Sequence, residues 1–172
     1  MLSKIDFENR ANRLWQDKCP FLFVVDFDLC NFQIYELAEM PSEILYDFEG
    51  RTNVSLSKGS NGFIFETNPI KFEDYKAAFK DVALNIRDGN TYLLNLTFPN
   101  QLSCNLSLND IFHNSKAKYK LKFFNDFVCF SPETFITINE GKIYSYPMKG
   151  TIDASIYDAE QIIMNDKKEI AE

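Results

Sequence analysis

The sequence predicts an α+β fold with a largely antiparallel β-sheet and flanking helices. Short β-prone runs separated by Gly- and Asn-containing turns recur along the chain, most densely over residues 118–148. An apolar period of three to four residues interrupts these runs after residue 71 and again after residue 154. Strand groups joined by hairpins, with helices between the groups, are typical of this class. With 172 residues, 45% of them hydrophobic, the chain can form one domain or half of a larger one.

The first part of the chain is predicted to be mainly β-structure. Residues 21–28 and 32–37 are β-prone runs on either side of Leu29-Cys30-Asn31, so we expect an opening hairpin there. A further strand is expected at residues 52–57, and the apolar run at residues 62–67 precedes Asn-Pro.

The period changes at residue 72. Apolar residues recur at steps of three and four, which predicts an amphipathic helix that ends near Asp88. These residues are Phe72, Tyr75, Phe79, Val82 and Ile86.

The second half of the chain alternates between both element types. We expect a strand over residues 91–98, a short helix over 106–112 with Ser107 as its N-cap, and consecutive strands over 118–148. Residues 155–172 have the pattern of a helix, which reaches Glu172 without a C-cap signal.

Composition excludes several classes of function. A net charge of −7 argues against broad binding to nucleic acids or anionic membranes. The alternating lysines of residues 118–122 predict a strand with one solvent-exposed face. Four widely separated cysteines, no signal-peptide pattern and no apolar run near the roughly 20 residues of a membrane span indicate a reduced, cytoplasmic protein.

One predicted hairpin brings an acid and an amine together. Two β-prone runs flank Asn139-Glu140-Gly141, and pairing centred on Glu140 would put Glu133 opposite Pro147 and diagonal to Lys149. Diagonal neighbours across a hairpin are about 7–8 Å apart. Glu133 and Lys149 could therefore face one small molecule from two sides.

Four segments carry motifs whose order and spacing are informative together. Residues 89–97 read Gly-Asn-Thr-Tyr-Leu-Leu-Asn-Leu-Thr, 131–135 read Ser-Pro-Glu-Thr-Phe, 147–151 read Pro-Met-Lys-Gly-Thr and 166–172 read Asp-Lys-Lys-Glu-Ile-Ala-Glu. Together they resemble the chorismate-utilising enzymes, the family of anthranilate, aminodeoxychorismate and isochorismate synthases.

The resemblance implies a fold and a division of the chain. The expected fold is the first half of that family's α/β sandwich. Residues 1–70 would be an N-terminal β-rich segment and residues 71–172 the first part of the catalytic domain. The missing C-terminal half of that domain is then an expected partner, in line with a helix that looks cut at Glu172.

The resemblance also implies roles for four residues. Lysine before Gly-Thr, here Lys149, is similar to the aminodeoxychorismate synthase branch, whereas alanine is usual in the anthranilate and isochorismate synthases. Lys149 is then the nucleophile toward chorismate and Glu133 the general acid, with Gly150 and Thr151 as substrate contacts. Burial would have to lower the pKa of Lys149 and raise the pKa of Glu133.

A magnesium ion and an ammonia-supplying partner follow from the same resemblance. Glu169 and Glu172 lie three residues apart and share one face of a helix, an arrangement that suits Mg²⁺. The family likeness implies Glu172 as the ligand, with Glu169 as a further contributor. It also implies a glutamine amidotransferase subunit as the source of ammonia.

Two alternatives stay open at this point. The chain could belong to an anthranilate or isochorismate synthase of the same family. It could also be an inactive, truncated remnant that acts only as a binding or structural module. For the aminodeoxychorismate synthase branch, we expect residues 1–172 alone to be inactive.

Overall fold

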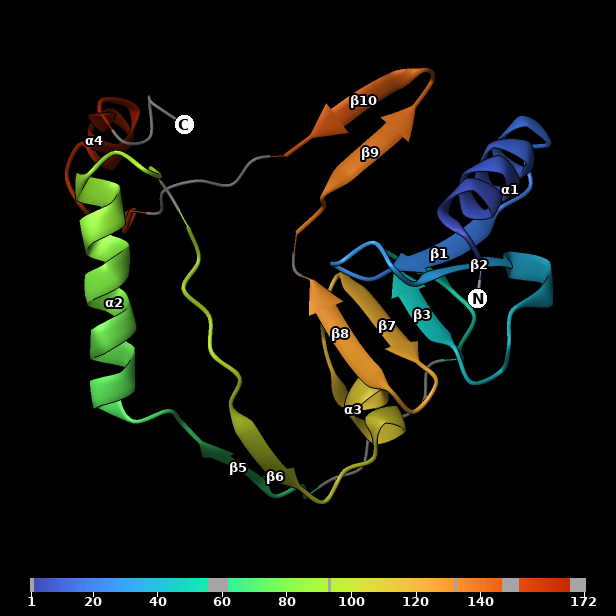
Figure 1. Ribbon diagram of the computed structural model, residues 1–172, viewed down its shortest axis with the longest axis horizontal. Helices are drawn as coiled ribbons and strands as arrows, with labels where there is room; N and C mark the ends of the chain where they lie inside the picture. Colours follow the sequence, from blue (N-terminus) through green and yellow to red (C-terminus); the bar gives the residue numbers. More distant parts are fainter. Residues whose placement is uncertain (1, 56–61, 93, 132, 147–151, 168–172) are drawn as a thin grey trace.

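The computed structural model describes residues 2–55, 62–92, 94–131, 133–146 and 152–167 (Figure 1). Within these residues the chain forms four α-helices and ten strands, and every strand pairing is antiparallel. The predicted α+β class is confirmed.

The N-terminal helix and hairpin form one part of the core. Helix α1 (Lys4–Gln16) precedes β1 (Phe21–Val25) and β2 (Phe32–Glu36), which pair as the predicted opening hairpin. Ser3 caps α1 because its hydroxyl accepts a hydrogen bond from the Asp6 N–H at 3.2 Å. Phe7 packs its ring against Phe32, with ring centroids 5.2 Å apart. Helix α1 was not predicted from the sequence.

A four-stranded sheet with the order β4-β3-β7-β8 forms the rest of the core. These strands are β3 (Leu45–Phe48), β4 (Arg51–Thr52), β7 (Tyr119–Phe123) and β8 (Phe127–Ser131), and the 3-10 turn η1 (Leu37–Glu39) leads into them from β2. The β3–β4 turn is tight, since both central residues, Glu49 and Gly50, have positive φ (57° and 87°).

Helix α3 (Leu108–Asn114) completes the core below this sheet. As predicted, Ser107 caps it, and Ser107 and Asp110 form a reciprocal capping box. We call α1, α3 and strands β1–β4, β7 and β8 the compact lobe. All buried apolar residues that the structure describes lie in this lobe or its connections: Leu14, Leu22, Phe32, Ile34, Ile44, Tyr46, Phe112 and Phe123.

One lysine of β7 departs from its predicted environment. Lys122 was expected on a solvent-exposed face, but it is only 6% exposed, and its ammonium donates to the Glu43 carbonyl at 3.1 Å. The backbone carbonyl supplies the polar contact that a buried ammonium requires.

A second part of the chain, the extension, lies on the opposite side of the molecule (Figure 1). It consists of β5 (Phe65–Asn68), α2 (Phe72–Arg87) and β6 (Gln101–Cys104), with β5 and β6 paired. Helix α2 is the predicted amphipathic helix, yet none of its residues is buried. Four of its five pattern-forming apolar side chains are exposed by 40% or more: Phe72, Tyr75, Phe79 and Ile86.

The last hairpin and the C-terminal helix differ in detail from their predictions. Strands β9 (Ile136–Asn139) and β10 (Lys142–Ser145) pair with Asn139 opposite Lys142, so the turn consists of Glu140 and Gly141. The predicted turn centre on Glu140 is therefore wrong. The hairpin turns between Glu140 and Gly141, because positive φ at both residues allows a two-residue turn. The expected pairing of Glu133 with Pro147 lies outside the described residues, because Pro147 is not among them.

Three further element predictions are wrong. The strand expected at residues 52–57 is not found at residues 53–55, because β4 ends at Thr52. Residues 91–98 contain no strand where the structure describes them, and no described strand lies paired with them. A run of strand-forming residues needs a neighbouring strand to satisfy its backbone groups. The helix predicted over residues 155–172 begins at Ala159 instead of residue 155, and α4 (Ala159–Met164) is followed by a break at Asn165 and Asp166. Residues 168–172 lie outside the described residues.

Candidate functional site

Of the six predicted site residues, the structure describes Glu133. The other five, Lys149, Gly150, Thr151, Glu169 and Glu172, lie outside the described residues. The expected approach of Lys149 to Glu133 and the expected magnesium site thus stay predictions.

Glu133 follows the end of β8 and has its main chain tied to Ser131. The Ser131 hydroxyl donates to the Glu133 carbonyl at 2.9 Å and accepts from the Glu133 N–H at 3.3 Å. A hydroxyl that bonds the main chain two residues on forms a small local turn. The Glu133 side chain is exposed, so the described residues do not supply the burial that a general acid was expected to need.

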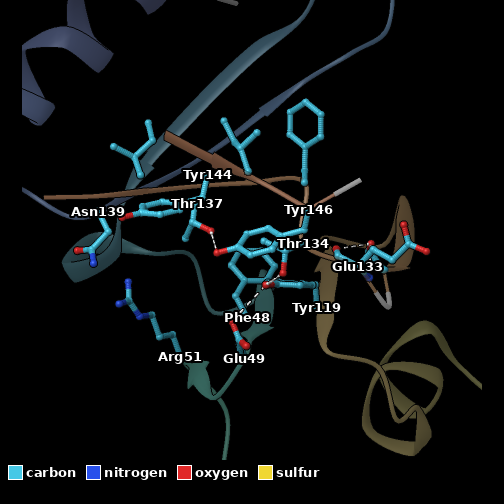
Figure 2. Close-up of a pocket in the computed structure, with 14 residues that line it drawn as sticks. Phe48, Glu49, Arg51, Tyr119, Glu133, Thr134, Thr137, Asn139, Tyr144 and Tyr146 are labelled. Atoms are coloured by element: carbon cyan, nitrogen blue, oxygen red, sulfur yellow. Dashed lines mark hydrogen bonds between the residues drawn. The ribbon is translucent and has the colours of Figure 1, made fainter. Parts of the chain in front are cut away.

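Glu133 lines a pocket of about 900 Å³ (Figure 2). Two parts of the molecule form its walls: the β9–β10 hairpin on one side, and the β3–β4 turn with the start of β7 on the other. The polar and aromatic side chains labelled around it in Figure 2 include Glu49, Arg51, Tyr119, Thr134, Tyr144 and Tyr146. The pocket is wide enough for a small polar molecule.

Four side chains beside this pocket form a hydrogen-bonded ring, which we call the Glu49 ring. The Lys118 ammonium lies 3.0 Å from Oε1 of Glu49 and donates to the Thr134 hydroxyl at 3.1 Å. The Tyr119 hydroxyl donates to Oε2 of Glu49 at 3.2 Å and lies 2.6 Å from Oγ1 of Thr134. The ring joins the β3–β4 turn, the start of β7 and the segment that follows β8.

The charges in this ring support each other. The hydrogen bond from Lys118 is the main reason that the pKa of Glu49 lies below its usual value, and the hydrogen bond to Glu49 is the main cause of the raised pKa of Lys118. Both shifts favour the charged forms. Glu49 therefore accepts both hydrogen bonds as a carboxylate.

The Glu49 ring was not predicted from the sequence. Glu49 and Tyr119 are 70 positions apart, and Glu49 belongs to no motif singled out in the sequence. The pairing of Phe48 with Tyr119, and of Tyr119 with Ser131, brings these positions together. Only knowledge of the strand order β3-β7-β8 would have placed them side by side.

Neither a metal cluster nor a membrane helix is found in the described part of the chain. His, Cys, Asp and Glu side chains there do not gather in a group of three or more that could hold a metal ion. Among the same residues, no helix combines the length and apolar character that crossing a bilayer requires.

Comparison with known proteins identifies relatives of the whole chain. An uncharacterized PabA-like protein of Haemophilus influenzae is 40% identical over 164 residues, which is 95% of this chain and 50% of that protein. An uncharacterized PabA-like protein of Pasteurella multocida is 37% identical over 166 residues, 95% of this chain and 51% of that protein. The chain thus spans about half the length of these curated relatives. No solved structure gives a significant match.

The family assignment rests on a match to most of the sequence. Residues 29–172 match the family described as chorismate binding enzyme, a range that contains Glu133, the Glu49 ring and all four motif segments. The chain belongs to the chorismate binding enzyme family.

Proposed function

We propose that this chain is part of an aminodeoxychorismate synthase component I, which converts chorismate and ammonia to 4-amino-4-deoxychorismate on the way to 4-aminobenzoate and folate. The observation that carries the proposal is Lys149 before Gly150 and Thr151, because lysine at this place resembles the aminodeoxychorismate synthase branch. The family membership supports the use of chorismate, and both relatives have PabA-like names.

The proposed reaction exchanges a hydroxyl group for an amino group. The neutral amine of Lys149 attacks C2 of the chorismate ring, the ring double bonds shift, and the C4–O bond breaks. Glu133 gives its proton to the departing hydroxyl, which leaves as water. Ammonia then forms a bond to C4, the ring double bonds shift back, and the C2–N bond to Lys149 breaks, which releases the neutral lysine. The ammonium group formed at C4 returns a proton to Glu133. The net change is chorismate plus ammonia to 4-amino-4-deoxychorismate plus water.

The position of Glu133 is compatible with this role. It follows β8 on the rim of the 900 Å³ pocket, and the β9–β10 hairpin connects it to the segment that contains Lys149. Its carboxyl group points away from the Glu49 ring in Figure 2, and no hydrogen bond or ion pair within the described residues engages it. The carboxyl group is thus free to meet a substrate.

A second half of the domain is part of the proposal. The exposed apolar side of α2 is a surface that a folded domain normally covers. The relatives are about twice as long as the matched region. We expect residues corresponding to the rest of those relatives to cover α2 and to bury Glu133.

Mg²⁺ and an amidotransferase complete the proposed enzyme. Glu172, with Glu169 nearby, would hold Mg²⁺, which would bind the chorismate carboxylate when present. A glutamine amidotransferase subunit would supply ammonia. Loss of activity on treatment with EDTA, with recovery on addition of Mg²⁺, would support the metal assignment, and full activity in EDTA would contradict it.

The product distinguishes the candidate activities. The complete gene product, incubated with chorismate, ammonium salt and Mg²⁺, should form 4-amino-4-deoxychorismate, detected by chromatography and mass spectrometry. Anthranilate with pyruvate, or isochorismate, would instead assign one of the other family activities. The absence of any turnover, with no change in melting temperature on addition of chorismate and Mg²⁺, would favour a binding or structural remnant.

A lysine variant tests the covalent step. In the complete gene product, chorismate should form a covalent adduct that intact-mass spectrometry can detect, and Lys149→Ala should abolish it. Lys142→Ala, which removes an exposed lysine of β10, is the matched control and should keep the adduct. Adduct formation that survives Lys149→Ala would remove Lys149 from the mechanism.

A further inference from the structure

The segment that carries Glu133 is held at two places, and the residues that hold it at the second place belong to no motif. On one side, the Ser131 hydroxyl binds both main-chain groups of Glu133. On the other side, the next residue is Thr134, whose hydroxyl lies within hydrogen-bond distance of Lys118 and Tyr119. Glu133 therefore lies between two fixed residues.

The direction of the hydrogen bonds in the Glu49 ring is determined by their partners. The Lys118 ammonium can only donate, so Oγ1 of Thr134 accepts its hydrogen bond. The Glu49 carboxylate can only accept, so the Tyr119 hydroxyl donates its hydrogen to Glu49. The hydroxyl of Thr134 must then donate to the Tyr119 oxygen at 2.6 Å. Each of the four groups has a partner in the ring, and Thr134 is both a donor and an acceptor.

The ring attaches this segment to the rigid part of the molecule. Tyr119 lies opposite Phe48 in β3 and opposite Ser131 in β8, so it is a member of the central sheet. Lys118 shares a main-chain hydrogen bond with Glu49, whose N–H donates to the Lys118 carbonyl at 2.9 Å. Contacts to paired strands fix a side chain more closely than contacts within a loop do.

We propose that Thr134 is a positioning residue: through its hydroxyl, the Glu49 ring fixes the main chain at Glu133 and so directs the Glu133 carboxyl group toward the substrate. This role rests on the proposed function, in which Glu133 is the general acid. Thr134 itself does not touch the reacting atoms. A general acid that is displaced by about 1 Å can lose about a hundredfold in rate, because proton transfer depends on geometry.

The first test separates position from binding. In the complete gene product, Thr134→Val removes the hydroxyl but keeps the shape of the side chain, and it should lower kcat at least tenfold while KM for chorismate stays within threefold. Thr134→Ser keeps the hydroxyl and should recover kcat to within threefold of the unsubstituted enzyme. An unchanged kcat in Thr134→Val, or an equal loss in Thr134→Ser, would overturn the proposal.

The second test does not depend on activity. Hydrogen–deuterium exchange of peptides that contain residues 133–135 should be about tenfold faster in Thr134→Val and unchanged in Thr134→Ser. Thr137→Val is the matched control, since it removes the hydrogen bond between Thr137 and Tyr146 in the same hairpin (3.2 Å) but leaves the ring intact. Equal exchange in Thr134→Val and the unsubstituted protein would overturn the positioning role.

The two tests distinguish a failure of this proposal from a failure of the proposed function. If the enzyme forms anthranilate or isochorismate, the aminodeoxychorismate assignment fails, and the same kinetic comparison on that product decides the role of Thr134. If the protein does not turn over chorismate at all, the exchange measurement still decides whether Thr134 fixes the segment. If 4-amino-4-deoxychorismate forms at an unchanged rate in Thr134→Val, the positioning role alone is wrong.

Discussion

The compact lobe and the extension are built from similar residues but differ in what their apolar side chains contact. In the lobe, Phe112 and Ile44 are fully buried, and helix, hairpin and sheet close around them. In the extension, Phe79 remains 51% exposed although its helix has a clear apolar side. An amphipathic pattern therefore specifies that a helix forms and which side it buries, whereas burial itself requires a partner surface.

The difference matters for the candidate site, because the lobe forms one wall of the pocket and the segment after β8 with the β9–β10 hairpin forms the other. The Glu49 ring depends on β3, β7 and β8, which are paired within the described residues. The segments implied to hold substrate and metal follow the β9–β10 hairpin. We therefore expect the acid side of the site to be formed by this chain, and the remaining walls to depend on the other half of the domain.

The largest expected effect is a cavity in the lobe. Phe112→Ala should lower the free energy of unfolding of this chain by about 3–5 kcal/mol, because it removes a fully buried ring from the core. Urea denaturation followed by far-UV circular dichroism measures the change. A loss below about 1 kcal/mol would mean that the lobe is not the stable part of the chain.

The effect of an equivalent substitution in the extension on the free energy of unfolding should depend on whether another surface covers α2. Phe79→Ala should change the free energy of unfolding of residues 1–172 by less than about 1 kcal/mol, since the ring is half exposed. In the complete gene product, the same substitution should cost about 3 kcal/mol if the other half covers α2. Equal small effects in both proteins would show that α2 stays uncovered.

Helix capping provides a smaller contrast between the two regions. Ser107→Ala should cost about 1 kcal/mol in the lobe, because it removes the cap of α3. The N-cap position of α2 is Lys71, whose side chain makes no capping hydrogen bond, so Lys71→Asp should stabilise the chain by about 0.5–1 kcal/mol. Urea midpoints of both variants test this, and a destabilising Lys71→Asp would contradict the assigned helix start.

The smallest effect concerns acid stability in the lobe. Hydrogen bonds from the Ser107 hydroxyl and main chain hold the pKa of Asp110 below its usual value. A carboxyl group whose pKa is lowered by folding stabilises the folded state above its unfolded pKa of about 3.9, and this contribution is lost as the pH falls through the folded pKa. Asp110→Asn should therefore show a smaller fall in melting temperature between about pH 5 and pH 3 than the unsubstituted chain. An identical fall in both proteins would remove Asp110 from the acid response.

Local patterns predicted much of the fold, and long-range pairing explains what they missed. The opening hairpin, α2 and α3 were predicted because their turns, periodicity and caps lie within a few residues of one another. Helix α1 was missed although Ser3 and Asp6 carry its capping signal. The strand expected at residues 91–98 is absent where the structure describes them, because a strand depends on a partner that its own sequence does not contain.

In the candidate site, too, local features could be predicted from the sequence and features that depend on strand order could not. Glu133 was predictable as a candidate because it lies in a short motif beside a hairpin. The strand register of that hairpin was not predictable, since a two-residue turn and a three-residue turn differ only in local φ values. The Glu49 ring was not predictable, because its members are brought together by the order of strands in the sheet.

The β3–β4 turn contains a glutamate in a left-handed conformation, with φ of 57°, a region that Asn or Gly occupies more readily. Glu140 occupies the corresponding place in the β9–β10 hairpin, with φ of 49°. Glu140→Asn should therefore only relieve the unfavourable backbone conformation at residue 140. Glu49→Asn would relieve it at residue 49 but would also remove the carboxylate that binds Lys118 and Tyr119. Selection for the proposed chorismate turnover should therefore accept the exchange at residue 140 and reject the one at residue 49.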